Sequence, residues 1–186
     1  MIPKISVITA TRNRASTLNR VYKSLKSQTF KNFEWIVCDD GSTDGTINLL
    51  KSYKKKSNFS IKIFHFKRRA GKPKIDNFCI KKAKGEFVIF ADSDDAFKKN
   101  SFSHFISEWN KIPKLTKLKT FGIISRVVSS NGQELEKKYN FKNKSISLID
   151  LNKNTERKEK WLFIKKNIIK KYKFLEIDYY VPEGIL

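Results

Sequence analysis

Short apolar runs alternate with helix-patterned segments through the first half of the chain. The runs are rich in β-branched and aromatic residues and predict strands, whereas apolar residues three or four positions apart predict helices. Strands are predicted over residues 4–10, 34–39, 61–66 and 86–91, and helices over 15–28, from 43 or 44 to 56, and over 74–84. This alternation indicates right-handed βαβ units around a mostly parallel sheet, so the sequence predicts an α/β fold.

The second half of the chain is patterned less regularly. A helix is predicted over residues 101–110 and a strand over 119–129, before a turn signal at 131–132. Residues 142–160 are polar and are expected to form a mobile loop, and an apolar stretch at 161–164 precedes a basic one. The apolar segment at residues 181–186 looks interrupted, which favours a chain that is truncated on its C-terminal side.

The composition suits one globular domain in a reducing compartment. The chain has 186 residues, of which 39% are hydrophobic and 13% aromatic, enough for a sizeable core. No stretch approaches the roughly 18 apolar residues of a membrane helix, and the N-terminus lacks the features of a signal peptide. Cys38 and Cys79 lie in apolar runs without metal-ligand spacing and are interpreted as reduced core thiols of a cytoplasmic protein.

The net charge of +22 adds a question about partners. Three interpretations remain open: a Lys-rich solvated surface, attraction to an anionic membrane leaflet, and binding to nucleic acid. Nucleic acid is the least favoured partner, because it does not explain the aspartates that cluster at the predicted strand ends.

Polar clusters follow three of the predicted strands directly. They cover residues 9–14 after the first strand, 39–42 after the second and 91–95 after the fourth. In open parallel sheets the ligand binds at the carboxyl ends of the strands, so these clusters are expected to meet at one site.

The cluster after the fourth strand carries three carboxylates, Asp92, Asp94 and Asp95. Carboxylates at the end of a buried strand are costly unless a cation meets them, and Mg²⁺ or Mn²⁺ takes carboxylate and phosphate oxygens. In extended backbone, the Asp-x-Asp spacing places Asp92 and Asp94 on one face. A surface turn or a helix cap is the competing explanation of this triplet.

The cluster after the second strand suits two different purposes. Ser42, Thr43 and Asp44 fit the cap of the following helix. Asp40 is instead expected to point into the ligand crevice, where its carboxylate can accept a hydrogen bond from a base N–H. The basic stretch at residues 68–74 could meet a diphosphate or form a solvated loop, and both interpretations stay open.

Together these elements resemble family 2 glycosyltransferases, in the order in which that family carries them. The resemblance is carried by residues 5–14, the connection at 27–37, the Asp-Asp-Gly-Ser-Thr-Asp-Gly-Thr motif at 39–46, the stretches at 71–77 and 83–87, Asp-Ser-Asp-Asp at 92–95, and Pro-Glu-Gly at 182–184. It implies the nucleotide-binding α/β sandwich known as GT-A. It also implies a single catalytic domain, with a nucleotide-binding half at 1–97 and a partial acceptor half at 98–186.

The resemblance implies a reaction as well. The enzyme would transfer a sugar from a nucleoside-diphosphate sugar, with a UDP-sugar expected, to a saccharide or glycolipid acceptor of surface polysaccharide biosynthesis. Most such enzymes invert the anomeric centre. The expected location is the cytoplasm, with peripheral contact to the inner face of the membrane.

The site roles follow from the same resemblance. Ala10, Thr11 and Arg12 would flank the base and ribose, Asp40 would hold the base, and Lys74, Asn77 and Ser93 would be further donor contacts. Asp94, with Asp92, would hold Mn²⁺ or Mg²⁺, and Asp92 would also reach the ribose or sugar. Glu183 would be the general base that deprotonates the acceptor hydroxyl.

The sequence departs from the family at three places. Arg12 stands where an aromatic residue often stacks on the base, which leaves the nucleobase open. Within residues 74–77 only Asn77 fits the more common Ala-Arg-Asn motif of the family, and Glu183 stands where the family more often has Asp. A nucleotidyltransferase is the competing class of enzyme, but it normally has a Gly-rich phosphate loop, and residues 9–14 contain no glycine.

Overall fold

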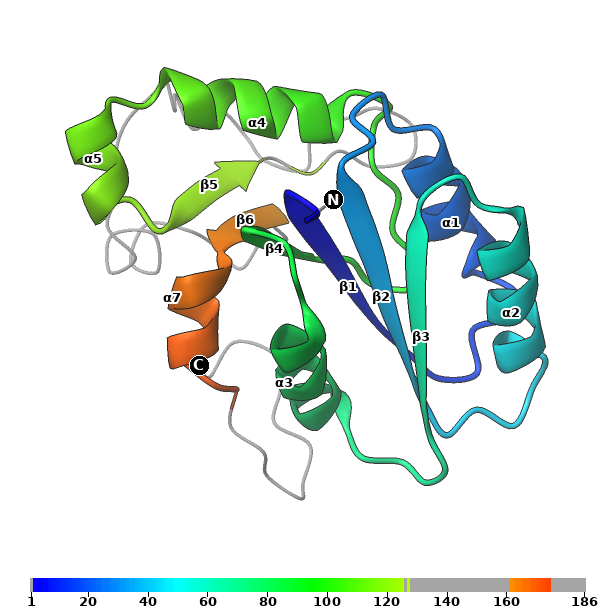
Figure 1. Ribbon diagram of the computed structural model, residues 1–186. Coiled ribbons are helices and arrows are strands. Elements are labelled where there is room, and N and C mark those ends of the chain that lie inside the picture. Colours follow the sequence, from blue (N-terminus) through cyan, green and yellow to red (C-terminus); the bar gives the residue numbers. More distant parts are fainter. Residues whose placement is uncertain (1, 126, 128–160, 175–186) are drawn as a thin grey trace.

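The computed structural model describes residues 2–125, 127 and 161–174, and Figure 1 shows how their elements are arranged. The strands are β1 (Ile5–Thr11), β2 (Phe33–Asp40), β3 (Ser60–Phe66), β4 (Phe87–Phe90), β5 (Gly122–Ser125) and β6 (Trp161–Lys165). The helices are α1 (Asn19–Lys26), α2 (Thr46–Lys56), α3 (Lys72–Lys82), α4 (Ser101–Lys111), α5 (Lys114–Lys119) and α7 (Lys166–Lys171).

The described strands form one sheet in the order β3-β2-β1-β4-β6-β5. The first four strands run parallel, whereas β6 pairs antiparallel with both β4 and β5. This confirms the predicted α/β fold with a mostly parallel sheet. Because the chain crosses from the β3 edge to place β4 beside β1, the carboxyl ends of β1, β2 and β4 lie at one edge of the sheet.

Two layers of helices cover the sheet and bury its two faces. Alternate residues of β1 and β2 pack on one side with α1, α2 and α4, around the fully buried Trp35. The other alternate residues pack with α3, where Ile75 and Cys79 are fully buried. Each fully buried Leu, Ile or Phe side chain contributes about 1.5–3 kcal/mol, so these two clusters hold the strand ends in register.

The two cysteines lie in the core of the α3 face, as the sequence predicts. Both are buried and free. A hydrogen bond to Cys38 and then burial raise the pKa of the Cys79 thiol, so it stays protonated at neutral pH.

A buried ion pair fixes the amino ends of the strands, opposite the predicted site. The Glu34 carboxylate is 1% exposed and accepts hydrogen bonds from the Ser6 hydroxyl at 2.7 Å and the Lys84 backbone N–H at 2.6 Å. Lys62 Nζ lies 2.5 Å from its other oxygen. Burial by itself raises the pKa of Glu34, but the bonds from Lys62, Ser6 and Lys84 outweigh it and hold that pKa below its ordinary value.

Two helix boundaries differ from the prediction for local reasons. Helix α1 begins at Asn19 rather than at residue 15, because Thr17 and Leu18 donate their backbone N–H groups to the Arg14 carbonyl in a preceding turn. Helix α3 ends at Lys82, before the predicted stop at Gly85. Gly85 has another role: a Cβ there would lie 2.5 Å from the Ser6 backbone nitrogen, so only glycine lets this loop approach β1.

The prediction of a strand over residues 119–129 was wrong in its first part. Helix α5 occupies Lys114–Lys119 after Pro113, and the described strand is limited to Gly122–Ser125. Pro113 is suited to the start of a helix, and α5 leaves its two leucines, Leu115 and Leu118, exposed. The predicted turn at 131–132 and loop at 142–160 lie outside the described residues. Within the described ranges no helix is long and apolar enough to cross a membrane.

Candidate functional site

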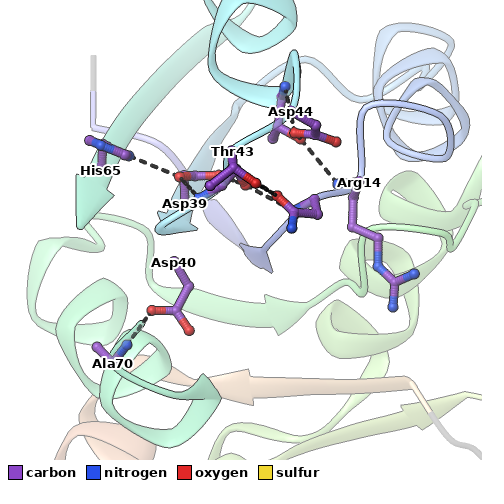
Figure 2. A network of polar contacts seen from close by, with 10 residues as sticks. Arg14, Asp39, Asp40, Thr43, Asp44, His65 and Ala70 are labelled. Carbon is purple, nitrogen blue, oxygen red and sulfur yellow. Dashed lines mark hydrogen bonds and ion pairs between the residues drawn. The ribbon is translucent and has the colours of Figure 1, made fainter. Parts of the chain in front are cut away.

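The buried carboxylate of Asp39 organises the carboxyl end of β2. Asp39 is fully buried and accepts hydrogen bonds from the Ser42 backbone N–H at 3.0 Å and from the Ser42 hydroxyl. His65, at the end of β3, places its Nδ1 2.8 Å from the Asp39 carboxylate. Figure 2 shows His65 and Asp39 meeting at the ends of neighbouring strands. His65 could not be singled out from the sequence, because its contact with Asp39 depends on the pairing of β3 with β2.

The loop after β2 is hydrogen-bonded to the loop after β1, which joins two of the predicted clusters. Asn13 donates its backbone N–H to the Ser42 hydroxyl at 2.9 Å, and its side-chain carbonyl accepts the Thr43 N–H at 2.9 Å. Arg14 donates its backbone N–H to Thr46 Oγ1 at 3.0 Å, while its guanidinium points away from this cluster (Figure 2). Asn13 has a φ of 51°, a left-handed conformation that Asn tolerates better than most residues. Asn13 is therefore a structural residue of the site that was not predicted from the sequence.

Asp44 holds the start of α2, as predicted from its position. Its carboxylate accepts the Thr46 backbone N–H at 2.9 Å and the Thr46 hydroxyl at 2.5 Å. It also accepts the Ala15 N–H at 3.2 Å from the loop after β1. The hydrogen bond from the Thr46 hydroxyl, joined by the backbone N–H bonds, lowers the pKa of Asp44. Of the three residues predicted to cap this helix, Asp44 alone contacts its first residue, whereas Ser42 and Thr43 bond to Asp39 and Asn13.

Asp40 faces the other side of the sheet and holds the loop that leads into α3. It is 7% exposed, and its two oxygens accept the backbone N–H groups of Ala70 at 2.5 Å and Gly71 at 3.1 Å. Gly41 and Gly71 have φ angles of 74° and 87°, which residues with a side chain rarely adopt. Figure 2 shows the Asp40 side chain directed toward Ala70, away from the Asp39 cluster. The predicted contact of Asp40 with a base stays a prediction.

Thr11 carries a buried hydroxyl that lacks a hydrogen-bond partner among the described residues. It is the last residue of β1, lies opposite Asp39 in the pairing with β2, and is 3% exposed. In the described part of the chain, its Oγ1 is the buried side-chain oxygen for which no hydrogen bond is found. Ala10 is half-buried and Arg12 is exposed on either side of it.

The Asp-Ser-Asp-Asp stretch forms a turn directly after β4. The Asp95 N–H donates to the Asp92 carbonyl at 3.2 Å, and the Asp92 N–H donates to the Asp95 carboxylate at 3.0 Å. The expectation of extended backbone from Asp92 to Asp94 was therefore wrong, because these two bonds close the chain into a turn. Asp92 and Asp94 are both exposed, whereas Ser93 is 6% exposed.

The first residues of α3 reach the turn after β4. Lys72 Nζ lies 3.1 Å from the carboxylate of Asp76 and 3.7 Å from that of Asp92. Lys74 is exposed on the same first turn, without a described contact to Asp92. Lys74 was the predicted donor contact, and Lys72 was predicted only as part of the basic stretch at residues 68–74. The sequence pattern does not show which of the two lysines faces the aspartates.

Asn77 connects α3 to the end of the described chain. Its side chain is 4% exposed, donates to the Phe174 carbonyl at 2.9 Å and accepts the Phe174 N–H at 2.9 Å. The Phe174 ring packs edge-on against Phe90, the last residue of β4, with ring centroids 5.6 Å apart. Phe174 is therefore fixed against Phe90, which precedes Asp92 by two residues in the sequence. Glu183, the predicted general base, lies outside the described residues.

No preformed metal cage is seen in the described ranges, where no group of three or more His, Cys, Asp or Glu side chains is arranged to hold an ion. Asp92 and Asp94 offer exposed carboxylate oxygens at the strand end. Mg²⁺ is usually held by one or two carboxylates together with substrate phosphates, so this donor set fits a metal that arrives with a nucleotide.

The fold and this strand-end site define a GT-A-type nucleotide-binding domain. The family model described as Glycosyl transferase family 2 matches residues 6–173. The chain therefore belongs to glycosyl transferase family 2.

Two curated relatives illustrate the similarity. The poly(ribitol-phosphate) beta-N-acetylglucosaminyltransferase TarS of Staphylococcus aureus is 37% identical over 122 residues, which cover 62% of this chain and 21% of TarS. The UDP-Glc:alpha-D-GlcNAc-diphosphoundecaprenol beta-1,3-glucosyltransferase WfaP of Escherichia coli is 37% identical over 102 residues, covering 55% of this chain and 39% of WfaP. The chain thus spans well under half the length of each relative.

Solved structures agree on the fold. The crystal structure of Staphylococcus aureus TarS 1-349 in complex with UDP-GlcNAc matches with a TM-score of 0.53 and 30% identity, covering 69% of this chain and 41% of that one. The mannosyltransferase PcManGT from Pyrobaculum calidifontis, in complex with GDP-Man and Mn²⁺, matches with a TM-score of 0.58 and 23% identity. That match covers 69% of this chain and 36% of PcManGT, and shows the fold alone.

Proposed function

We propose that this chain carries the donor site of an enzyme that transfers a sugar from a UDP-sugar to a saccharide or lipid-linked acceptor of surface polymer biosynthesis. Family membership supports the reaction class, and the UDP-sugars of TarS and WfaP support the donor. The observation that carries the donor's position is the buried Thr11 hydroxyl, which has no described partner. A buried hydroxyl costs free energy until something hydrogen-bonds to it, and a ligand at the strand ends supplies such a group.

The residues around Thr11 would hold the base and ribose. Ala10 and Arg12 flank it, and the Arg12 guanidinium is a planar group that stacks on ring systems. Asp40 already accepts two backbone N–H groups. A carboxylate has about four lone-pair sites, so Asp40 retains capacity for a base N–H.

Asp94 and Asp92 would hold a divalent metal, Mn²⁺ or Mg²⁺, together with the donor's phosphates. Such a metal neutralises negative charge on the diphosphate leaving group as the glycosidic bond breaks. The turn between Asp92 and Asp95 keeps both carboxylates at the strand end. Buried Ser93 and exposed Lys74 are proposed as further donor contacts.

Glu183 is proposed as the general base of an inverting, single-displacement reaction. It follows Phe174 by nine residues, a length of chain that spans up to about 30 Å when extended. Phe174 is anchored beside the end of β4 by Asn77 and Phe90. The proposed contribution of Asn77 is therefore to position this segment as well as to shape the donor site.

The basic surface of α1 and α2 is proposed to face an anionic membrane leaflet in the cytoplasm, where a lipid-linked acceptor would be met. The two helices touch through Tyr22 and Tyr53, whose rings stack with centroids 3.8 Å apart. Neither helix contains an acidic residue. Their exposed cations are Arg20, Lys23, Lys26, Lys51, Lys54, Lys55 and Lys56. Each basic residue near an anionic surface adds about 1 kcal/mol of attraction.

A thermal-shift titration with UDP, GDP and CDP, each with and without Mn²⁺, tests the donor site. A ligand that binds only the folded chain raises its melting temperature. We expect a shift with UDP that grows with Mn²⁺, and we expect Asp94→Ala to lose the metal-dependent part only. If no nucleotide shifts the melting temperature of the wild-type chain, the proposed donor site is wrong.

A further inference from the structure

Lys72 is placed between two carboxylates of very different exposure. Its Nζ is 3.1 Å from Asp76 Oδ2, a hydrogen-bond distance, and 3.7 Å from Asp92 Oδ1, an ion-pair distance. The Asp76 side chain is 5% exposed, whereas those of Lys72 and Asp92 are 43% and 57% exposed. Asp76 is thus the buried anchor of the ammonium, and Asp92 is the exposed group that the ammonium faces.

The position of Lys72 in α3 is unfavourable for a purely structural lysine. It is the first residue of the helix, where the macrodipole is positive and disfavours a cation. The first turn contains no acidic residue, and Lys74 adds a second cation there. A locally unfavourable charge that is held in place by a buried carboxylate is typical of a functional position.

The positive end of α3 also meets the strand-end site. Asp40 draws the loop before α3 toward the end of β2 through Ala70 and Gly71. Lys72 then reaches the turn that follows β4 at Asp92. The helix dipole and the Lys72 ammonium therefore act on the same space, beside the proposed metal-holding aspartates.

We infer that Lys72 binds the diphosphate of the nucleotide-sugar donor, and that Asp76 is the residue that positions it. An ammonium fixed at this place stabilises phosphate oxygens by a charge-assisted hydrogen bond without any divalent metal. Its longer contact with Asp92 is one that a phosphate oxygen can replace. This inference rests on the proposed donor site and adds to it a cation contributed by the chain itself.

The test compares the binding of UDP and uridine in EDTA by calorimetric titration. The difference between the two ligands reports the diphosphate contacts alone. We expect the wild-type chain to bind UDP more tightly than uridine. Lys72→Met should lower the affinity for UDP about tenfold and leave the affinity for uridine unchanged. Lys72→Arg keeps the charge and should keep most of the preference. Lys81→Met, an exposed lysine in the last turn of the same helix, is the matched control and should behave as wild type.

A second variant distinguishes lost binding from misfolding, because Lys72→Met removes the lysine that pairs with the buried Asp76. The double variant Lys72→Met, Asp76→Asn removes both charges and should also lose the preference for UDP. If both variants discriminate UDP from uridine as the wild type does, Lys72 does not bind the diphosphate, although the donor site stands. A wild-type chain that binds neither ligand overturns the donor site and this inference with it.

Discussion

The imidazole of His65 places Nδ1 2.8 Å from Oδ2 of Asp39, joining the carboxyl ends of β3 and β2. The same carboxylate accepts both hydrogen-bonding groups of Ser42, so its side-chain hydrogen bonds within the described residues come from a strand end and the turn after it. This one carboxylate therefore determines where the loop before α2 lies. Through Asn13, that loop in turn fixes the loop after β1.

His65→Ala should lower the free energy of unfolding by about 1 kcal/mol, because it removes one hydrogen bond from a buried carboxylate. The His65 side chain is 43% exposed, so water can take its place in part. Urea unfolding measures the change, with substitution of the exposed His104 in α4, His104→Ala, as the control. Equal stabilities of the two variants would show that the His65 contact contributes nothing.

Glu34 should make stability depend on pH in acid. Its folded-state pKa lies below the ordinary value, so the unfolded state binds more protons there. The stabilisation is complete above the unfolded pKa of about 4.3 and is lost as the pH falls through the folded pKa. Glu34→Gln should therefore lose less stability than wild type when urea unfolding is repeated at successively lower pH below that value.

The partner of Glu34 provides an independent check at neutral pH. Lys62→Met leaves a buried carboxylate without its cation and should cost about 2 kcal/mol, discounted because the Lys62 side chain is 29% exposed. Lys81→Met, which removes an exposed lysine elsewhere, should stay within about 0.5 kcal/mol of wild type. Similar stabilities for both variants would contradict the importance of the Glu34 pair.

Thr11→Val should separate stability from donor binding. Valine has the same shape and removes a buried hydroxyl that has no described partner, so the free energy of unfolding should stay unchanged or rise by up to about 1 kcal/mol. UDP affinity should fall by about tenfold, the loss of one hydrogen bond in a dry site. Calorimetric titration and urea unfolding measure the two effects.

Thr9→Val is the matched control two residues earlier on the same face of β1. The Thr9 hydroxyl accepts the indole N–H of buried Trp35 at 2.9 Å. Its loss leaves that N–H unpaired and should cost about 1–3 kcal/mol of stability with UDP affinity retained. A Thr11→Val chain that binds UDP as tightly as wild type would place the donor elsewhere.

Removing three cations from α2 should weaken membrane binding. Lys51, Lys54 and Lys55 changed together to Gln should reduce the affinity for phosphatidylserine-containing vesicles by about a hundredfold, at about 1 kcal/mol per charge. Vesicle sedimentation measures this. The control changes Lys111, Lys114 and Lys119 to Gln, which removes the same charge from α4 and α5. Equal losses from both triple variants would mean that the α1 and α2 surface is not a specific membrane contact.

The sequence by itself determined the fold class and which strand ends carry the chemistry. Alternating periods of two and 3.6 residues are local properties, so they mark strands and helices without knowledge of the tertiary structure. Buried strands are mostly apolar, and the aspartates that end β2 and follow β4 were visible because they interrupt those apolar runs. The role of Asp44 at the start of α2 was predictable because it too is local: its partner Thr46 is two residues away.

The tertiary structure decided which of those residues meet. His65 and Asp39 are 26 residues apart, and Asn77 and Phe174 are 97 apart, so only strand order and helix packing bring them together. Lys72 and Lys74 look alike in the sequence, but the direction in which α3 starts puts Lys72, rather than Lys74, against Asp92. That no described residue bonds to the Thr11 hydroxyl is likewise a property of its surroundings. Long-range contacts of this kind depend on the packed core, whereas the sequence pattern records only which face of each element is buried.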